Sequence, residues 1–102
     1  MATGENQEFD DLHHLIKKGD RVKMRAWMSA GGDPNLRNKF GWSLLMLAAL
    51  RGRTDMVEDL LAAGAKTNLK NDFGDTAAGL ARLKGFHRTA KAIERAMVND
   101  GV

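Results

Sequence analysis

Apolar side chains recur along this sequence at the spacing of an α-helix. Met56 and Val57 are followed four positions later by Leu60 and Leu61, which places all four on one side of a helix. Similar stripes occur in two earlier groups: Leu12, Leu15 and Ile16, and Met24, Trp27 and Met28. Stripes of this kind predict amphipathic helices whose apolar side, methionines and Trp27 included, lies in the core.

The same residue types return at a fixed interval. Phe40-Gly41 recurs as Phe73-Gly74, 33 positions later (73 − 40). Further pairs with this spacing are Gly31 and Gly64, Asn35 and Asn68, Leu36 and Leu69, Leu47 and Leu80, and Ala48 and Ala81. A period of this length with matching small and apolar positions predicts an array of stacked structural repeats.

Each repeat carries signals for the beginning and the end of a short first helix. The three expected N-caps share this spacing and have side-chain oxygens that can accept backbone hydrogen bonds: Asp10, Ser43 and Thr76. Nine positions after each cap stands a glycine, where a helix ends in a residue with positive φ: Gly19, Gly52 and Gly85. A second helix is predicted after each of these glycines, beginning near Thr54 in the middle repeat. Gly31 and Gly64 are expected to end the first two of these second helices.

Two turn segments, 36–41 and 69–74, separate the helix pairs, and each ends in Phe-Gly. Glycine there suits a β-turn position with positive φ. About three such units are the usual minimum for a stable array. The expected organisation is a disordered lead-in over 1–8, an array over 9–97 and a frayed tail over 98–102. Within the array we expect a first repeat over 9–37, a middle repeat over 38–70 and a last repeat over 71–97.

The last repeat differs from the middle one as a terminal cap should. Glu94 and Met97 stand where the middle repeat has Leu61 and Gly64. The final helix is therefore expected to face solvent with a polar position and to lack a glycine stop, and terminal repeats need such solvated faces.

Composition narrows the function classes. The 102 residues carry 16 basic and 13 acidic side chains, for a net charge of +3, and no cysteine. No disulfide, thiol nucleophile or thiolate metal site is therefore possible, and the polar, acidic start lacks a secretory signal pattern. We expect a cytoplasmic monomer that does not enter a membrane. The basic residues cluster in 34–54 and 76–93, where no acidic residue occurs, and clusters of one sign can steer partners of the other.

These residues resemble the ankyrin repeat family. Residues 40–52 are similar to its G-x-T-P-L-H-x-A-A-x-x-G core, and residues 57–68 to its V-V-x-x-L-L-x-x-G-A-D-x-N run, while 20–35 carry the same second-half pattern. The resemblance covers 9–97 and implies an all-α, ankyrin-type solenoid of about three helix-turn-helix repeats with short β-turn or hairpin tips. The family's Pro and its loop-tying His are absent from both the Ser43–Met46 and the Thr76–Gly79 tetrapeptides. Gly79 inside a helix costs about 1 kcal/mol relative to Ala, which makes the last repeat the weakest.

No catalytic, cofactor or metal site stands out. His13 and His14 are adjacent, whereas metal-binding pairs on a helix sit at i, i+4. Ser43 and Thr76 are explained as caps, and Glu58-Asp59 as the solvent side of a helix. Catalysis needs a nucleophile, a base and an orienting group together, and this sequence offers no such set, so we expect no enzyme.

The family's binding surface generally comprises the hairpin tips and the exposed face of the first helices, and the resemblance carries these onto this chain. The tip residues are Arg37, Lys39, Phe40, Trp42, Lys70, Asp72, Phe73 and Asp75. The first-helix residues are Lys17, Lys18, Leu50, Arg51, Leu83 and Lys84. Phe40 and Trp42 are alternate residues of an extended turn, so they could present an aromatic surface together. The alternative is that one of the two folds back onto the stack.

The leading hypothesis is a non-enzymatic module that binds a partner protein with an acidic surface, as an adaptor or as a dedicated inhibitor or immunity protein. A basic concave face could instead bind anionic partners such as nucleic acid, with affinity that falls steeply with salt. Alternatively, the basic residues only solvate an array whose partner binds elsewhere or whose role is minor. The third hypothesis is a hydrolase or metal enzyme, for which activity or stoichiometric metal would be lost on His13→Ala; we expect neither.

Overall fold

The computed structural model describes the backbone of residues 7–100 and the side chains of residues 7–98. Six helices account for most of this part of the chain: α1 (Gln7–Lys18), α2 (Arg21–Ser29), α3 (Leu44–Leu50), α4 (Thr54–Ala62), α5 (Ala77–Leu83) and α6 (His87–Asp100). The β-structure found among these residues is one isolated antiparallel bridge between Arg37 and Ser43. The predicted all-α architecture is confirmed.

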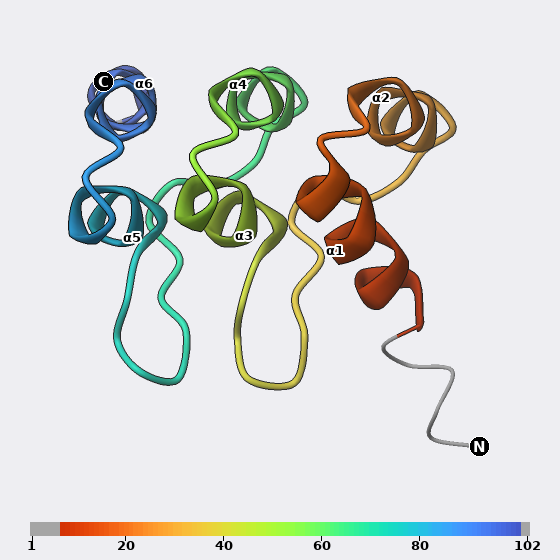
Figure 1. Ribbon diagram of the computed structural model, residues 1–102, viewed down its shortest axis with the longest axis horizontal. Helices are drawn as coiled ribbons and strands as arrows, with labels where there is room; N and C mark the ends of the chain where they lie inside the picture. The colour runs from red at the N-terminus through yellow and green to blue at the C-terminus, as the bar shows by residue number, and fades with distance from the viewer. Residues whose placement is uncertain (1–6, 101–102) are drawn as a thin grey trace.

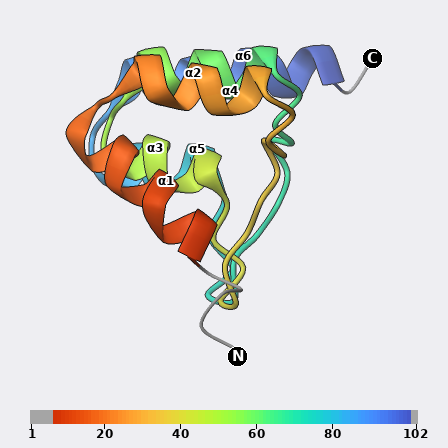
Figure 2. The ribbon, with the colours of Figure 1, turned by 90° about the vertical axis from the view of Figure 1, so that its right-hand side faces the viewer.

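The helices pair in chain order, and the three pairs lie side by side along the long axis (Figure 1). The second helices, α2, α4 and α6, form one row, and the first helices, α1, α3 and α5, form the other. Two hairpins, between α2 and α3 and between α4 and α5, project past the first helices on the side away from the second helices (Figure 2). The array is therefore a tandem stack, as the 33-residue period predicts.

The core lies between the two rows of helices and between neighbouring pairs. Every residue from Leu44 to Ala49 is buried, because α3 is flanked by α1 and α5 and covered by α4. Met24, Met46 and Met56 are buried as well, and Trp27 is half-buried against the same cluster. The methionine stripes are thus core, as their helical spacing predicts.

Two of the three predicted N-caps form. The Ser43 hydroxyl accepts a hydrogen bond from the Met46 amide at 3.2 Å, and the Thr76 hydroxyl accepts one from the Gly79 amide at 3.1 Å. α4 begins at Thr54, where the sequence predicts it. Side-chain caps therefore set the starts of α3 and α5, whereas α4 begins after Arg53 without a side-chain cap.

The prediction for Asp10 is wrong, because α1 begins three residues earlier, at Gln7. The longer helix buries Phe9 in the core. Glu8, which the sequence assigns to the lead-in, accepts a hydrogen bond from the Trp27 indole N–H at 2.8 Å. The remainder of the expected lead-in, 1–6, lies outside the described residues.

The other end of the array also differs from the expected boundary. α6 continues to Asp100, so Val98 belongs to this helix instead of to a frayed tail. Gly31 and Gly64 end α2 and α4 with φ of 101° each, whereas Met97 stands at the corresponding place in α6. The absence of a glycine stop, which the sequence predicts, explains why the helix continues. Residues 101–102 lie outside the described part.

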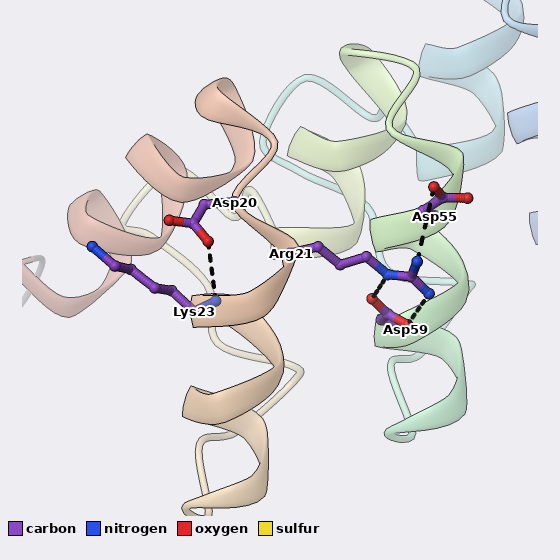
Figure 3. A network of polar contacts seen from close by, with 5 residues as sticks. All are labelled: Asp20, Arg21, Lys23, Asp55 and Asp59. Atoms are coloured by element: carbon purple, nitrogen blue, oxygen red, sulfur yellow. Dashed lines mark hydrogen bonds and ion pairs between the residues drawn. The ribbon is translucent and has the colours of Figure 1, made fainter.

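Arginine side chains join neighbouring units. The Arg53 guanidinium donates to the carbonyls of Ile16 and Lys17 at the end of α1, at 3.0 and 2.5 Å. Arg21 at the start of α2 reaches α4, where it makes two hydrogen bonds to the Asp59 carboxylate, at 2.6 and 3.1 Å, and lies 3.9 Å from Asp55 (Figure 3). Asp59 is therefore half-buried in an ion pair between units, which corrects its assignment to the solvent side of the helix.

Candidate functional site

An asparagine side chain organises each hairpin tip. The Asn38 amide oxygen accepts hydrogen bonds from the backbone N–H groups of Phe40 and Trp42, both at 3.0 Å. In the next hairpin, 33 positions later, the Asn71 amide oxygen accepts from Phe73 and Asp75, at 2.9 and 3.0 Å. Sequence reasoning missed these two residues, although their spacing marks them. They give both tips the same shape and hold the candidate binding residues in place.

The two hairpins are also joined to each other. The Asp72 amide donates to the Phe40 carbonyl at 2.9 Å. Arg37 donates from one guanidinium nitrogen to the Lys70 carbonyl at 2.9 Å and from another to the Gly41 carbonyl at 3.2 Å. Arg37, predicted as a binding residue, therefore ties the hairpins together, although its side chain stays exposed.

A methionine occupies the place of the family's loop-tying His. The thioether sulfur of Met46 accepts a hydrogen bond from the Ser43 amide at 3.4 Å. The contact lies within one turn of α3, so it closes a capping box without reaching a neighbouring loop. Contacts between the hairpins come instead from the backbone and from Arg37.

Exposed aromatic rings stand at the two tips, but not in the predicted pair. Phe40 is 50% exposed and Phe73 is 76% exposed, while Trp42 is half-buried and packs against the core. Trp42 folds back because the turn that Asn38 closes returns the chain to the stack at that residue. The Lys39 ammonium lies 5.2 Å from the centre of the Phe40 ring. The aromatic surface therefore runs from one hairpin to the next.

Basic residues form a row along the first helices. Lys17, Arg51 and Lys84 lie at the C-terminal ends of α1, α3 and α5 and are exposed. Lys18 beside them is exposed too, and Leu83 is 76% exposed, whereas Leu50 is half-buried against the core. Within residues 7–98, no carboxylate pairs with Lys17, Arg51 or Lys84.

The pKa of His13 is affected by the positive charges of this row. Burial lowers the pKa of His13 most, the positive charges of Lys17 and Arg51 lower it further, and Asp10 partly opposes them. The imidazole is therefore neutral at pH 7, and its neighbours form a locally positive surface.

The predicted residues thus fall into two groups at opposite ends of the first helices: the basic row and the hairpin tips. At the tips, Lys39, Lys70 and Asp72 are exposed, while Asp75 is half-buried and pairs through its backbone with Asn71. These two groups, with the first helices between them, are called the concave face below.

The described residues show no arrangement typical of a metal site. Among residues 7–98, no three His, Asp or Glu side chains group so as to hold a metal ion. Within the same part of the chain, none of the helices has the length and apolar character needed to cross a membrane.

Comparison with known proteins agrees with the stacked architecture. A profile described as ankyrin repeats (3 copies) matches residues 12–97. An ankyrin repeat protein of Pseudomonas aeruginosa is 43% identical to this chain over 54 residues, which cover 52% of this chain and 32% of that protein. The chain thus spans about a third of that relative. Ankyrin repeats generally mediate protein–protein interaction and are typically non-enzymatic. Because the profile covers most of its length, the chain belongs to the ankyrin repeat family.

Proposed function

We propose that this chain is a non-enzymatic module that binds an acidic surface of another protein through its concave face. The observation that carries the proposal is the row of Lys17, Arg51 and Lys84 at the C-terminal ends of three successive first helices. Among the described residues these cations have no carboxylate partner, so their field acts on whatever approaches. Complementary charge on a partner speeds association and fixes its orientation.

The hairpin tips supply the apolar part of the proposed interface. Complete burial of a Phe side chain is worth about 1.5–3 kcal/mol, and Phe40 and Phe73 are both at least half-exposed. The hydrogen bonds that Asn38 and Asn71 make within each tip hold these rings on ordered loops. A preformed surface loses little conformational entropy on binding, which favours affinity.

The proposed partner is one dedicated protein, which the chain serves as an adaptor or as an inhibitor of the immunity type. We place this role in the cytoplasm and assign it to the monomer. The absence of an arranged nucleophile, base and orienting group in the sequence supports a binding role without catalysis.

Affinity capture from nuclease-treated native lysate, with quantitative mass spectrometry, tests this proposal. The double variant Arg51→Glu/Lys84→Glu is expected to retain the captured partner about tenfold less well. The matched control is Arg25→Glu/Lys91→Glu, which changes the net charge equally at exposed positions on the second helices. If both double variants reduce retention of the captured partner equally, or if neither reduces it, the concave face is not the binding surface.

A basic row of this kind also fits nucleic acid, and the same variants separate the two possibilities. Protein recognition predicts one retained partner that also weakens on Phe40→Ala/Phe73→Ala. Binding of unrelated DNA or RNA, steeply weakened by salt and indifferent to loss of the two rings, would favour the nucleic-acid function instead.

A further inference from the structure

One asparagine side chain of the first unit joins it to the loop that follows α4 in the second unit. The Asn35 amide oxygen accepts a hydrogen bond from the Lys66 N–H at 2.7 Å, and its amide nitrogen donates to the Gly64 carbonyl at 3.2 Å. The Asn35 side chain thus hydrogen-bonds both a backbone donor and a backbone acceptor of segment 64–66, which covers it. Ala65, between those two groups, is buried.

The next interval has the same asparagine but no such covering segment within the described part of the chain. Asn68 lies 33 positions after Asn35, is exposed, and makes no hydrogen bond with the described residues. The residue that corresponds to Gly64 is Met97, and there α6 continues as a helix instead of turning into a loop. Figure 2 shows α6 running past the ends of α2 and α4, so its backbone does not follow the path of the earlier segment.

An open cleft of about 740 Å³ lies where these elements part. Leu61, Leu69 and Met97 line its apolar side, and the loop 64–68 lines the rest, including Lys66 and the Asn68 amide. This volume is within the range of ligand sites, about 300–1,000 Å³. Met97 is 40% exposed and Val98, next to it on α6, is 70% exposed, so the apolar wall is accessible.

We propose that this cleft binds an extended segment of a partner protein, whose main chain pairs with the Asn68 amide as segment 64–66 pairs with Asn35. An apolar side chain of that segment packs against Leu61, Leu69 and Met97. The cleft is separate from the concave face, so the proposal stands whether or not the proposed function is correct.

Charge indicates an acidic residue in the bound segment. Lys66 is the charged side chain that lines the cleft. Between the first and second units, the residue that corresponds to Lys66 is Asp33 of the first unit. The segment that covers this unit carries Lys66 at the matching position, 33 residues later (66 − 33 = 33). These two exposed residues have opposite charges, although no ion pair joins them. Lys66 has no carboxylate partner among the described residues, so an Asp or Glu in the bound segment complements its charge.

The chain's own covering segment provides the probe. The first peptide has the sequence of residues 64–73 with Lys66→Asp, and the second retains Lys66. Each is titrated into the isotope-labelled full chain and followed by NMR. We expect saturable shifts at the Asn68 side-chain amide and the Met97 methyl group, with several-fold weaker binding of the second peptide at low salt because of the like charge.

Variants of the host identify the contact. Asn68→Ala removes two hydrogen bonds to the peptide and should raise its Kd about tenfold. Lys91→Ala, an exposed change on α6 that does not line the cleft, should leave the Kd unchanged. Absence of saturable shifts at millimolar peptide, shifts confined to the hairpin tips, or an unchanged Kd for Asn68→Ala would overturn the proposal. Concentration-dependent shifts at the same atoms without peptide would assign the cleft to a second copy of this chain.

Discussion

The pair Asn35 and Asn68 offers a direct measurement of what one inter-unit contact contributes. Both residues occupy the same place in successive repeats, but Asn35 makes two hydrogen bonds to the following unit, and Asn68 makes none with the described residues. Replacing each by alanine removes the same side chain from equivalent places, although Asp33-Pro34 precedes Asn35 and Lys66-Thr67 precedes Asn68. The difference between the two variants therefore measures mainly the contact between units.

The structure sets the size of the expected loss. A neutral hydrogen bond contributes about 1 kcal/mol net. The partner groups belong to Gly64 and Lys66, which are exposed, so water can replace the lost amide and no large desolvation penalty is added. We expect Asn35→Ala to lower the free energy of unfolding by about 1–2 kcal/mol, and Asn68→Ala to change it by no more than about 0.5 kcal/mol.

Urea denaturation followed by circular dichroism measures both values. With a slope of about 1–2 kcal/mol per molar for a small domain, the midpoint of Asn35→Ala should fall by about 1 M. Thermal unfolding should show a loss of about 4–8 °C per kcal/mol in a chain of this size. Equal losses in the two variants would refute the reasoning, because they would show that local loop conformation, and not the contact between units, sets the stability.

Three further predictions concern Gly52, His13 and Gly79. Gly52 and Gly85 both have positive φ, 66° and 80°, but a methyl group at Gly52 would lie 2.8 Å from the Phe86 ring, whereas Gly85 has open space. Gly52→Ala should therefore destabilise the fold by about 1–3 kcal/mol more than Gly85→Ala in urea denaturation. The pKa of His13 is lowered from 6.5 in the folded state, so the unfolded state binds the proton more tightly. Stability should therefore fall as the pH drops below that value, and urea midpoints at pH 7.5 and 5 should show a smaller fall for His13→Gln. Gly79→Ala should stabilise α5 by up to about 1 kcal/mol in thermal unfolding. The gain is reduced by the close contact of the new methyl group with the Thr76 hydroxyl, at 3.1 Å.

The sequence by itself determined the number, the kind and the order of the repeating elements. The caps Ser43 and Thr76 and the stops Gly52 and Gly85 act within one helical turn, so local sequence is enough to place them. The 33-residue period then implies that equivalent residues occupy equivalent places. The resemblance to the ankyrin repeat family, and not the period, points to the basic residues of the first helices as binding candidates.

Tertiary structure alone decided which side chains remain exposed and which join units. The sequence leaves open whether Phe40 and Trp42 share an exposed surface or one of them folds back onto the stack. Trp42 packs against the core, and Phe73 is the second exposed ring at the hairpin tips. Arg53 and Arg21 find partners more than 30 positions away in the chain. Neither contact recurs with the period, because Arg53 corresponds to Asp20 and Phe86, and Arg21 corresponds to Thr54 and His87.

The two ends of the array show the same division most clearly. Asp10 has the residue type of a cap, but α1 already begins at Gln7, and Phe9 is buried in the core. Met97 stands where a glycine would end the helix, so the sequence predicts that α6 continues. Only the path of α6 in the structure shows that Asn68 lacks the covering loop that Asn35 has. Residue type and spacing determine what a side chain can do locally. Its exposure and its partners depend on chain segments that folding brings beside it, and those segments carry no mark in its own stretch of sequence.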